Sequence, residues 1–297
     1  MSAPRPLPRA VSGELLDLQS SGPTLRGYIA GSGPPLLLVH SVNAAAAAAE
    51  VRPLHEHYRA IRTVLSVDLP GFGASDRSDR AYDPRLMSDA VLAAAAQLSA
   101  RTGNAPVDAL AVSLSCEFLA RAANQRPAAF RRIALVSPTG LRGGAFRDGP
   151  PGSVVGARWI LRLLRGPGWG RPLFRGLTRP AVIRYFLERT WGSKSIDETL
   201  WRYAIETTRQ PGAEHAPLHF LAARLFSRDA RTLYQSLTQP VWMSHGIRGD
   251  FTDYRGKQCV ADRPTWSFDV FPTGALPYFE VPTEFFARFD AFLGSPR

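Results

Sequence analysis

The chain has 297 residues, a hydrophobic content of 45% and a formal net charge of +11. This length suits one large domain with a sizeable core, with or without an insertion, and the composition excludes a disordered or fibrous chain. No apolar run reaches the roughly 20 residues needed to cross a bilayer. Residues 1–12 lack the apolar segment of a signal peptide, so we expect a cytoplasmic protein.

Almost all the positive charge comes from arginine, since Lys194 and Lys257 are the only lysines. Such a bias is weak evidence for a nucleic-acid partner, and we predict none. The location of the charge is more informative, because residues 142–194 hold ten Arg and one Lys against Asp148 and Glu188.

The only cysteines are Cys116 and Cys259, too few for a disulfide framework or a metal cluster. His215 and His219 have the spacing of a helical pair but lack a third ligand at a recognisable spacing. We predict reduced thiols, no metal and no cofactor.

Strand and helix patterns alternate in the first half of the chain. A hairpin is expected over 13–30, around a turn that reads SSGP, and a strand buried on both faces over 36–39. A helix follows from Asn43, its possible cap, to about Tyr58. Further strands are expected at 63–67, 107–112 and 133–136, and helices at 88–101 and 114–124. This alternation predicts a mostly parallel, doubly wound sheet of the α/β class.

The alternation stops after Gly140. Residues 141–237 favour helices and are rich in Arg, Trp, Gly and Pro, with no convincing strand. Strands resume at 241–245 and 266–270, and an amphipathic helix follows at 283–293. We therefore predict one core domain, formed by 1–140 and 238–297, with a helical cap inserted at 141–237.

Three motifs stand in the two core segments. Residues 68–76 read DLPGFGASD after a predicted strand, a glycine-rich turn. Residues 111–115 read AVSLS, in which Ser113 lies between a strand and a helix with small residues two positions away on each side. Residues 272–282 read PTGALPYFEVP, close to the C-terminus.

These motifs resemble those of the α/β-hydrolase superfamily over roughly residues 25–140 and 238–297. The resemblance implies that Ser113 occupies the nucleophile elbow. It also implies a catalytic histidine after Gly274, but Ala275 stands there. The chain is therefore expected to be an atypical member with an incomplete catalytic triad.

The resemblance also places an oxyanion hole. Leu114 would offer its N–H at a helix N-terminus, and Val42 would supply a second N–H after the pair His40-Ser41. The side chain of Asn43 is an alternative donor, although capping a helix is its other role. We interpret His40 as structural.

The triad acid is expected in the loop after the strand at 241–245. Asp250 is the first choice and Asp253 the alternative. The competing interpretation is that Asp250 forms an ion pair with Arg248 or Arg255. The missing histidine favours this interpretation, because a triad acid would have no imidazole ring to orient.

No histidine can take the place of the missing base by a local shift of alignment. All six precede the C-terminal motif: His40, His55, His57, His215, His219 and His245. A helix of the cap could bring His219 or His215 over Ser113. Tyr278 is a poor base at neutral pH because its ordinary pKa is about 10.

The predicted cap combines aromatic residues with arginines at helical spacing, Arg158, Arg162 and Arg165 among them. Such a segment suits an amphipathic helix packed over a pocket, or one that lies on an anionic membrane surface. In either case the roof of the pocket should be apolar, so a hydrophobic small molecule is expected as substrate or ligand.

Two functions follow from these residues. The first is an atypical hydrolase acting on a hydrophobic ester, acyl or carbonyl compound, with Ser113 as nucleophile or polar anchor. The second is a catalytically silent protein that binds a hydrophobic ligand in the same pocket. Loss of one triad member costs a serine protease about 10⁴-fold or more in turnover, so a fast general esterase is not expected.

Overall fold

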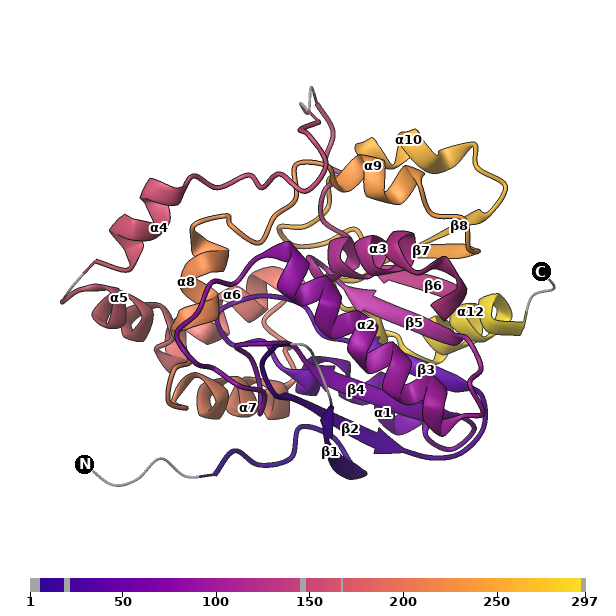
Figure 1. The fold of residues 1–297 in the computed structure, drawn as a ribbon, viewed down its shortest axis with the longest axis horizontal. Helices are drawn as coiled ribbons and strands as arrows, with labels where there is room; N and C mark the ends of the chain where they lie inside the picture. Colours follow the sequence, from indigo (N-terminus) through magenta and orange to yellow (C-terminus); the bar gives the residue numbers. More distant parts are fainter. Residues whose placement is uncertain (1–5, 19–21, 145–147, 167, 295–297) are drawn as a thin grey trace.

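The computed structural model describes residues 6–18, 22–144, 148–166 and 168–294. Its centre is an eight-stranded sheet with the order β1-β2-β4-β3-β5-β6-β7-β8 (Figure 1). The strands are β1 Glu14–Leu18, β2 Leu25–Ala30, β3 Pro35–Val39, β4 Thr63–Asp68, β5 Val107–Val112, β6 Phe130–Val136, β7 Val241–Gly246 and β8 Trp266–Phe271. All neighbours from β4 to β8 are parallel, which confirms the predicted mostly parallel, doubly wound sheet.

The predicted hairpin is confirmed as β1 and β2, which pair antiparallel from Glu14 with Ile29 to Leu18 with Leu25. Strand β2 then pairs antiparallel with β4. Of the predicted turn, Ser20 and Ser21 lie outside the described residues.

Alternate residues of the buried strands pack against helices on opposite faces of the sheet. In β3, Leu37 and Val39 join a cluster with helices α2 (Pro84–Arg101) and α3 (Ser115–Gln125). Leu36 and Leu38 instead join α1 (Arg52–Tyr58) and α12 (Pro282–Gly294). A strand covered on both sides needs a continuous apolar run, and β3 has one.

The helix predicted from Asn43 to Tyr58 is wrong over its first half. The chain forms a loop after Asn43, a short 3-10 turn from Ala48 to Val51, and then α1. The Asn43 side chain accepts from the N–H of Ala45 at 2.7 Å, which makes a local turn rather than a helix cap. The backbone N–H of Ala48 donates to Asp68 at 2.7 Å, so a tertiary contact overrides the helix propensity of the alanines.

Six helices lie between β6 and β7 in the described part of the chain. They are α4 Arg158–Leu164, α5 Gly170–Leu177, α6 Pro180–Trp191, α7 Glu198–Thr208, α8 His215–Leu221 and α9 Ala230–Gln235. Helices α4 to α8 gather at one end of the molecule, whereas α9 packs with α3 and α10 (Gln258–Ala261) beside the sheet (Figure 1). No helix among the described residues is long and apolar enough to cross a membrane.

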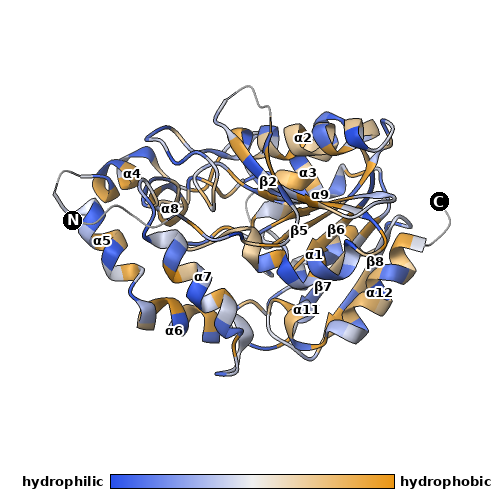
Figure 2. Ribbon diagram, turned by 90° about the horizontal axis from the view of Figure 1, so that it is seen from below, coloured by the Kyte–Doolittle hydropathy of each residue, from blue (hydrophilic) through white to orange (hydrophobic). Residues whose placement is uncertain are grey.

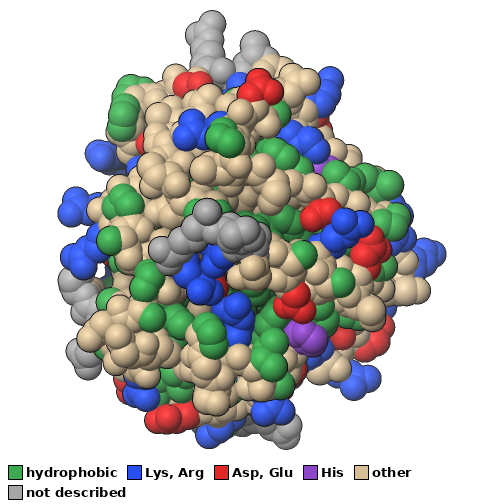
Figure 3. Space-filling model, turned by 90° about the vertical axis from the view of Figure 1, so that its right-hand side faces the viewer, with side chains coloured by type: hydrophobic (Ala, Val, Ile, Leu, Met, Phe, Trp, Pro, Cys, Tyr) green, Lys and Arg blue, Asp and Glu red, His purple; other side chains and the backbone are tan. Residues whose placement is uncertain are grey.

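The hydropathy of the ribbon follows this arrangement. The central strands are strongly hydrophobic, whereas helices α4 to α7 alternate hydrophobic and hydrophilic residues (Figure 2). The opposite end of the molecule carries both basic and acidic side chains (Figure 3).

The C-terminal helix α12 closes one face of the sheet with aromatic side chains. Phe285, Phe289 and Phe292 are buried, and all three rings contact Trp242 of β7. The Trp242 indole N–H also donates to Asp269 at 2.7 Å. Phe285 of α12 also contacts Tyr278 of the short helix α11 (Pro277–Glu280), which follows the loop that carries Ala275.

Candidate active site

Ser113 sits in a strained turn between β5 and α3. Its φ is +55°, a left-handed conformation that costs a non-glycine residue roughly 1–3 kcal/mol. Its N–H donates to the carbonyl of Val136 in β6 at 2.8 Å, which holds the turn against the sheet. This sharp turn between strand and helix is the geometry of a nucleophile elbow.

Small residues lie two positions away from Ser113 on each side. Ala111 and Ser115 are both fully buried, and the Ser115 hydroxyl donates to the carbonyl of His40 at 2.5 Å. Serine at this position therefore ties the elbow to the end of β3, a bond that a glycine would not form.

His40 is structural, as predicted. The N–H of Leu69 donates to His40 Nε2 at 3.0 Å, so Nδ1 carries the proton and donates to Ser41 O at 2.5 Å. Burial lowers the pKa of His40 to about 4, which keeps the ring neutral.

Ser113 faces a cavity of about 150 Å³, here called the inner chamber. Its polar lining comes mostly from the ends of the strands and from one end of α6. The lining residues are Ser41, Val42, Asn43, Glu50, Val112, Ser113, Leu114, Ser137, Thr139, Leu187, Thr190, Phe220, Phe226, Phe251, Ala275 and Leu276. Ala275 thus lies in the same chamber as Ser113.

The two backbone groups expected to form an oxyanion hole also line this chamber. The N–H groups of Val42 and Leu114 have no acceptor among the residues that the structure describes. The N–H of Leu114 lies at the start of α3, where the helix dipole favours negative charge. Asn43 is less suited to this task, since its Nδ2 already donates to Ser41 Oγ at 3.0 Å and to Glu50 Oε1 at 2.7 Å.

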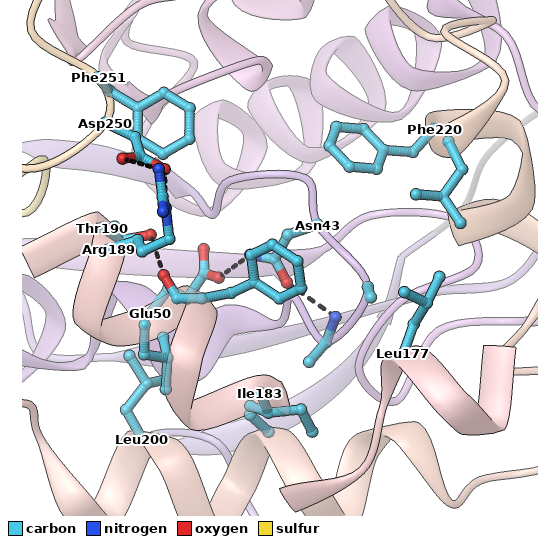
Figure 4. Close-up of a pocket in the computed structure, with 16 residues that line it drawn as sticks. Asn43, Glu50, Leu177, Ile183, Arg189, Thr190, Leu200, Phe220, Asp250 and Phe251 are labelled. Carbon is cyan, nitrogen blue, oxygen red and sulfur yellow. Dashed lines mark hydrogen bonds and ion pairs between the residues drawn. The ribbon is translucent and has the colours of Figure 1, made fainter. Parts of the chain in front are cut away.

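A second cavity of about 290 Å³, the outer chamber, adjoins the first. Apolar residues of α5 to α8 make up half of its lining residues, as Figure 4 shows for Leu177, Ile183 and Leu200. Six residues line both chambers: Asn43, Glu50, Leu187, Thr190, Phe220 and Phe251. The two cavities therefore form one mostly apolar site, with Ser113 in its smaller part.

The acid candidates lie away from the inner chamber. Asp250 lines the outer chamber and forms an ion pair with Arg189 of α6 (Figure 4), a different arginine from those considered in the sequence. Asp253 pairs with Arg255 at 2.9 Å, an interaction that lowers the pKa of Asp253. Neither carboxylate lines the inner chamber with Ser113.

All six histidines fall within the described ranges, and none lines either chamber. His219 of α8 packs against the ring of Tyr82, and its Nδ1 donates to the carbonyl of His215 at 2.9 Å. The next residue, Phe220, takes the place over the cavity. The Ser113 hydroxyl has no hydrogen-bond partner among the described residues.

Sequence reasoning missed Glu50. Its side chain is buried, lines both chambers and accepts hydrogen bonds from Ser41 N–H at 2.9 Å and from Asn43. Burial raises the pKa of Glu50 above its ordinary value of 4.5. A lone carboxylate within a run of alanines was the available signal, because such a residue must find a polar place in a buried segment.

No protein-family model matches the chain, and no curated protein matches it in sequence. Solved structures do match. An esterase from Exiguobacterium antarcticum superposes with a TM-score of 0.73 at 15% identity, over 96% of this chain and 100% of that one. A serine hydrolase involved in carbazole degradation gives 0.72 at 12% identity, over 95% and 99%.

An epoxide hydrolase gives a TM-score of 0.70 at 19% identity, over 94% of this chain and 97% of that one. The chain has the α/β-hydrolase fold. The chemistries of these neighbours differ, so the fold alone does not choose a reaction for this α/β-hydrolase-fold chain.

Proposed function

We propose that this α/β-hydrolase-fold protein is an atypical hydrolase that acts slowly on a hydrophobic ester, acyl or carbonyl compound. The observation that carries the proposal is the strained Ser113 turn, which lines the inner chamber together with Val42 and Leu114, whose N–H groups have no acceptor among the described residues. A substrate oxygen held by two such donors is polarised for attack. The helices α4 to α8 act as the cap, and the apolar outer chamber receives the rest of the substrate.

The proposal predicts covalent chemistry at Ser113. A fluorophosphonate probe should add to the wild type at this residue, and p-nitrophenyl butyrate should be turned over slowly. Ser113→Ala should lose both reactions, because the attacking oxygen is gone. Intact mass and ester turnover measure these outcomes.

If the folded wild type neither reacts with the probe nor turns over the ester, the proposed hydrolase activity is wrong. This result would favour the alternative, a protein that binds a hydrophobic ligand without chemistry. Ligand binding is then read from displacement of a fluorescent fatty acid.

We also propose that the tip formed by α4 and α5 contacts an anionic membrane surface. Trp159 and Leu163 lie four residues apart on α4 and are 65% and 56% exposed. Arg158 and Arg162 on the same helix are exposed and have no carboxylate partner among the described residues. Exposed apolar and basic side chains on one helix are typical of interfacial membrane binding.

Arg158→Glu/Arg162→Glu should weaken binding to vesicles of phosphatidylcholine mixed with phosphatidylglycerol. Each arginine near such a surface contributes about 1 kcal/mol, so a loss of about 30-fold is expected in co-sedimentation. Arg101→Glu/Arg126→Glu is the matched control, since both residues are exposed on the core and the change in charge is equal. Equal losses of vesicle binding in both variants would show that only the net charge of the protein matters. The proposed contact between the α4–α5 tip and the membrane would then be wrong.

A further inference from the structure

Glu50 lies at the junction of the two chambers. Its side chain lines both, and the residue is only 6% exposed. Figure 4 shows its carboxyl group next to the Asn43 amide, to which it is hydrogen-bonded. A substrate that places its carbonyl beside Ser113 and its apolar part in the outer chamber must pass this carboxyl group.

The surroundings of Glu50 are neutral. Its two oxygens accept from Ser41 N–H at 2.9 Å and from Asn43 Nδ2 at 2.7 Å, and no Arg, Lys or His pairs with it among the described residues. The other titratable side chains nearby are the buried hydroxyl of Tyr278 and the Arg189–Asp250 ion pair of the outer chamber. A buried carboxylate without a cationic partner holds its proton more tightly than an ordinary one.

We propose that Glu50 is the proton-transferring residue of this site and does for Ser113 what a histidine at position 275 would do. This inference rests on the proposed function, because it assigns the base for the same reaction. A carboxylate of raised proton affinity is a better general base than an ordinary one at neutral pH. Ser113 and Glu50 line the same small chamber, and no hydrogen bond joins their side chains in the structure, so the proposal carries the proton between them through one water.

The Ser113 Oγ proton passes through the water to the Glu50 carboxylate while Oγ forms a bond to the ester carbonyl carbon. The carbonyl oxygen takes the electron pair of the broken π bond and accepts hydrogen bonds from the N–H groups of Val42 and Leu114. The tetrahedral intermediate then breaks its bond to the alcohol oxygen, which takes the proton from Glu50. Water releases the acyl group by the same two transfers.

A positioning role is the competing explanation, since Glu50 also holds the loop that carries Val42. The two roles differ in their dependence on pH. A base must be ionised, so the rate rises with pH through the raised pKa of Glu50 and levels off once the carboxyl group has lost its proton. A loop support that is removed lowers the rate by one factor at every pH and leaves this rising limb in place.

The test measures the rate of fluorophosphonate labelling of the full chain from pH 5 to 9, read by intact mass. Wild type should show the rising limb. Glu50→Gln should label about 100-fold more slowly at high pH and lose the limb, because the general base is gone. Glu50→Asp keeps an ionisable group, so its labelling rate should still rise with pH, at a lower overall rate. This variant also provides a test if Glu50→Gln fails to fold.

Glu117→Gln is the control. Glu117 is another buried carboxyl near the elbow, with a pKa raised to about 7 by burial, but it lines neither chamber. Its variant should keep the rising limb of the wild type. A limb that survives in Glu50→Gln, or that vanishes in Glu117→Gln, overturns the assignment of Glu50 while the hydrolase stands. No labelling of wild type at any pH overturns both.

Discussion

Ala204→Phe is expected to remove the preference for long acyl chains that the proposed function predicts. Ala204 is buried on α7 and lines the outer chamber, so a phenyl ring there occupies the space that an acyl chain would fill. Each buried methylene contributes about 0.8 kcal/mol, which corresponds to about a fourfold change in kcat/KM. Between p-nitrophenyl acetate and hexanoate the wild type should therefore gain about 200-fold, and the variant should gain almost nothing.

The same series separates a blocked chamber from a damaged protein. Turnover of the acetate should change little in Ala204→Phe, because the inner chamber that holds Ser113 is left intact. Ala100→Phe, an exposed position on α2, should keep the full chain-length dependence. If wild type treats all chain lengths alike, the acyl chain does not enter the outer chamber, and the proposed binding mode is wrong.

Gly274→Ala is expected to destabilise the fold by about 3 kcal/mol, because the loop before Ala275 lies against the backbone of α6. A Cβ at Gly274 would lie 2.4 Å from the carbonyl oxygen of Thr190 and 2.5 Å from Trp191 backbone atoms. The N–H of Ala275 donates to the same Thr190 oxygen at 2.9 Å. The added methyl group must push the inserted helices away from the core, and urea unfolding would measure the loss.

Gly176→Ala is the matched control on α5. A Cβ there meets no atom within 4 Å, and alanine favours a helix over glycine by about 0.5–1 kcal/mol. The free energy of unfolding should therefore stay unchanged or rise slightly. Equal stability of Gly274→Ala and wild type would mean that α6 does not press on this loop in solution and does not form the wall of the inner chamber beside Ala275.

Much of the fold was predictable because local patterns and tertiary packing agree. The strand at 36–39 is apolar throughout and lies in the middle of the sheet, buried on both faces. The helix expected at 88–101 extends back to Pro84, with Asp83 as its cap. The exception is the alanine run after Asn43, where helix propensity is strong but a contact from Asp68 to the Ala48 N–H fixes a loop.

The elbow was likewise readable from the sequence alone, because Ser113 needs only its immediate neighbours to define it: a strand before, a helix after and small residues beside. The same holds for the alanine at position 275 and for the absence of any histidine after residue 245. These are properties of consecutive residues, and short-range sterics determine them.

Only the tertiary structure decided which distant side chains meet Ser113. Asp250 follows the expected strand, yet Arg189, from a helix inserted some sixty residues earlier, pairs with it in the outer chamber. His219 lies on α8, which covers the cavity, but the orientation of this helix points Phe220 toward the cavity instead of His219. Glu50 enters the site because the loop after β3 folds back on Ser41 and Asn43, and no local pattern specifies such a long-range arrangement of charge.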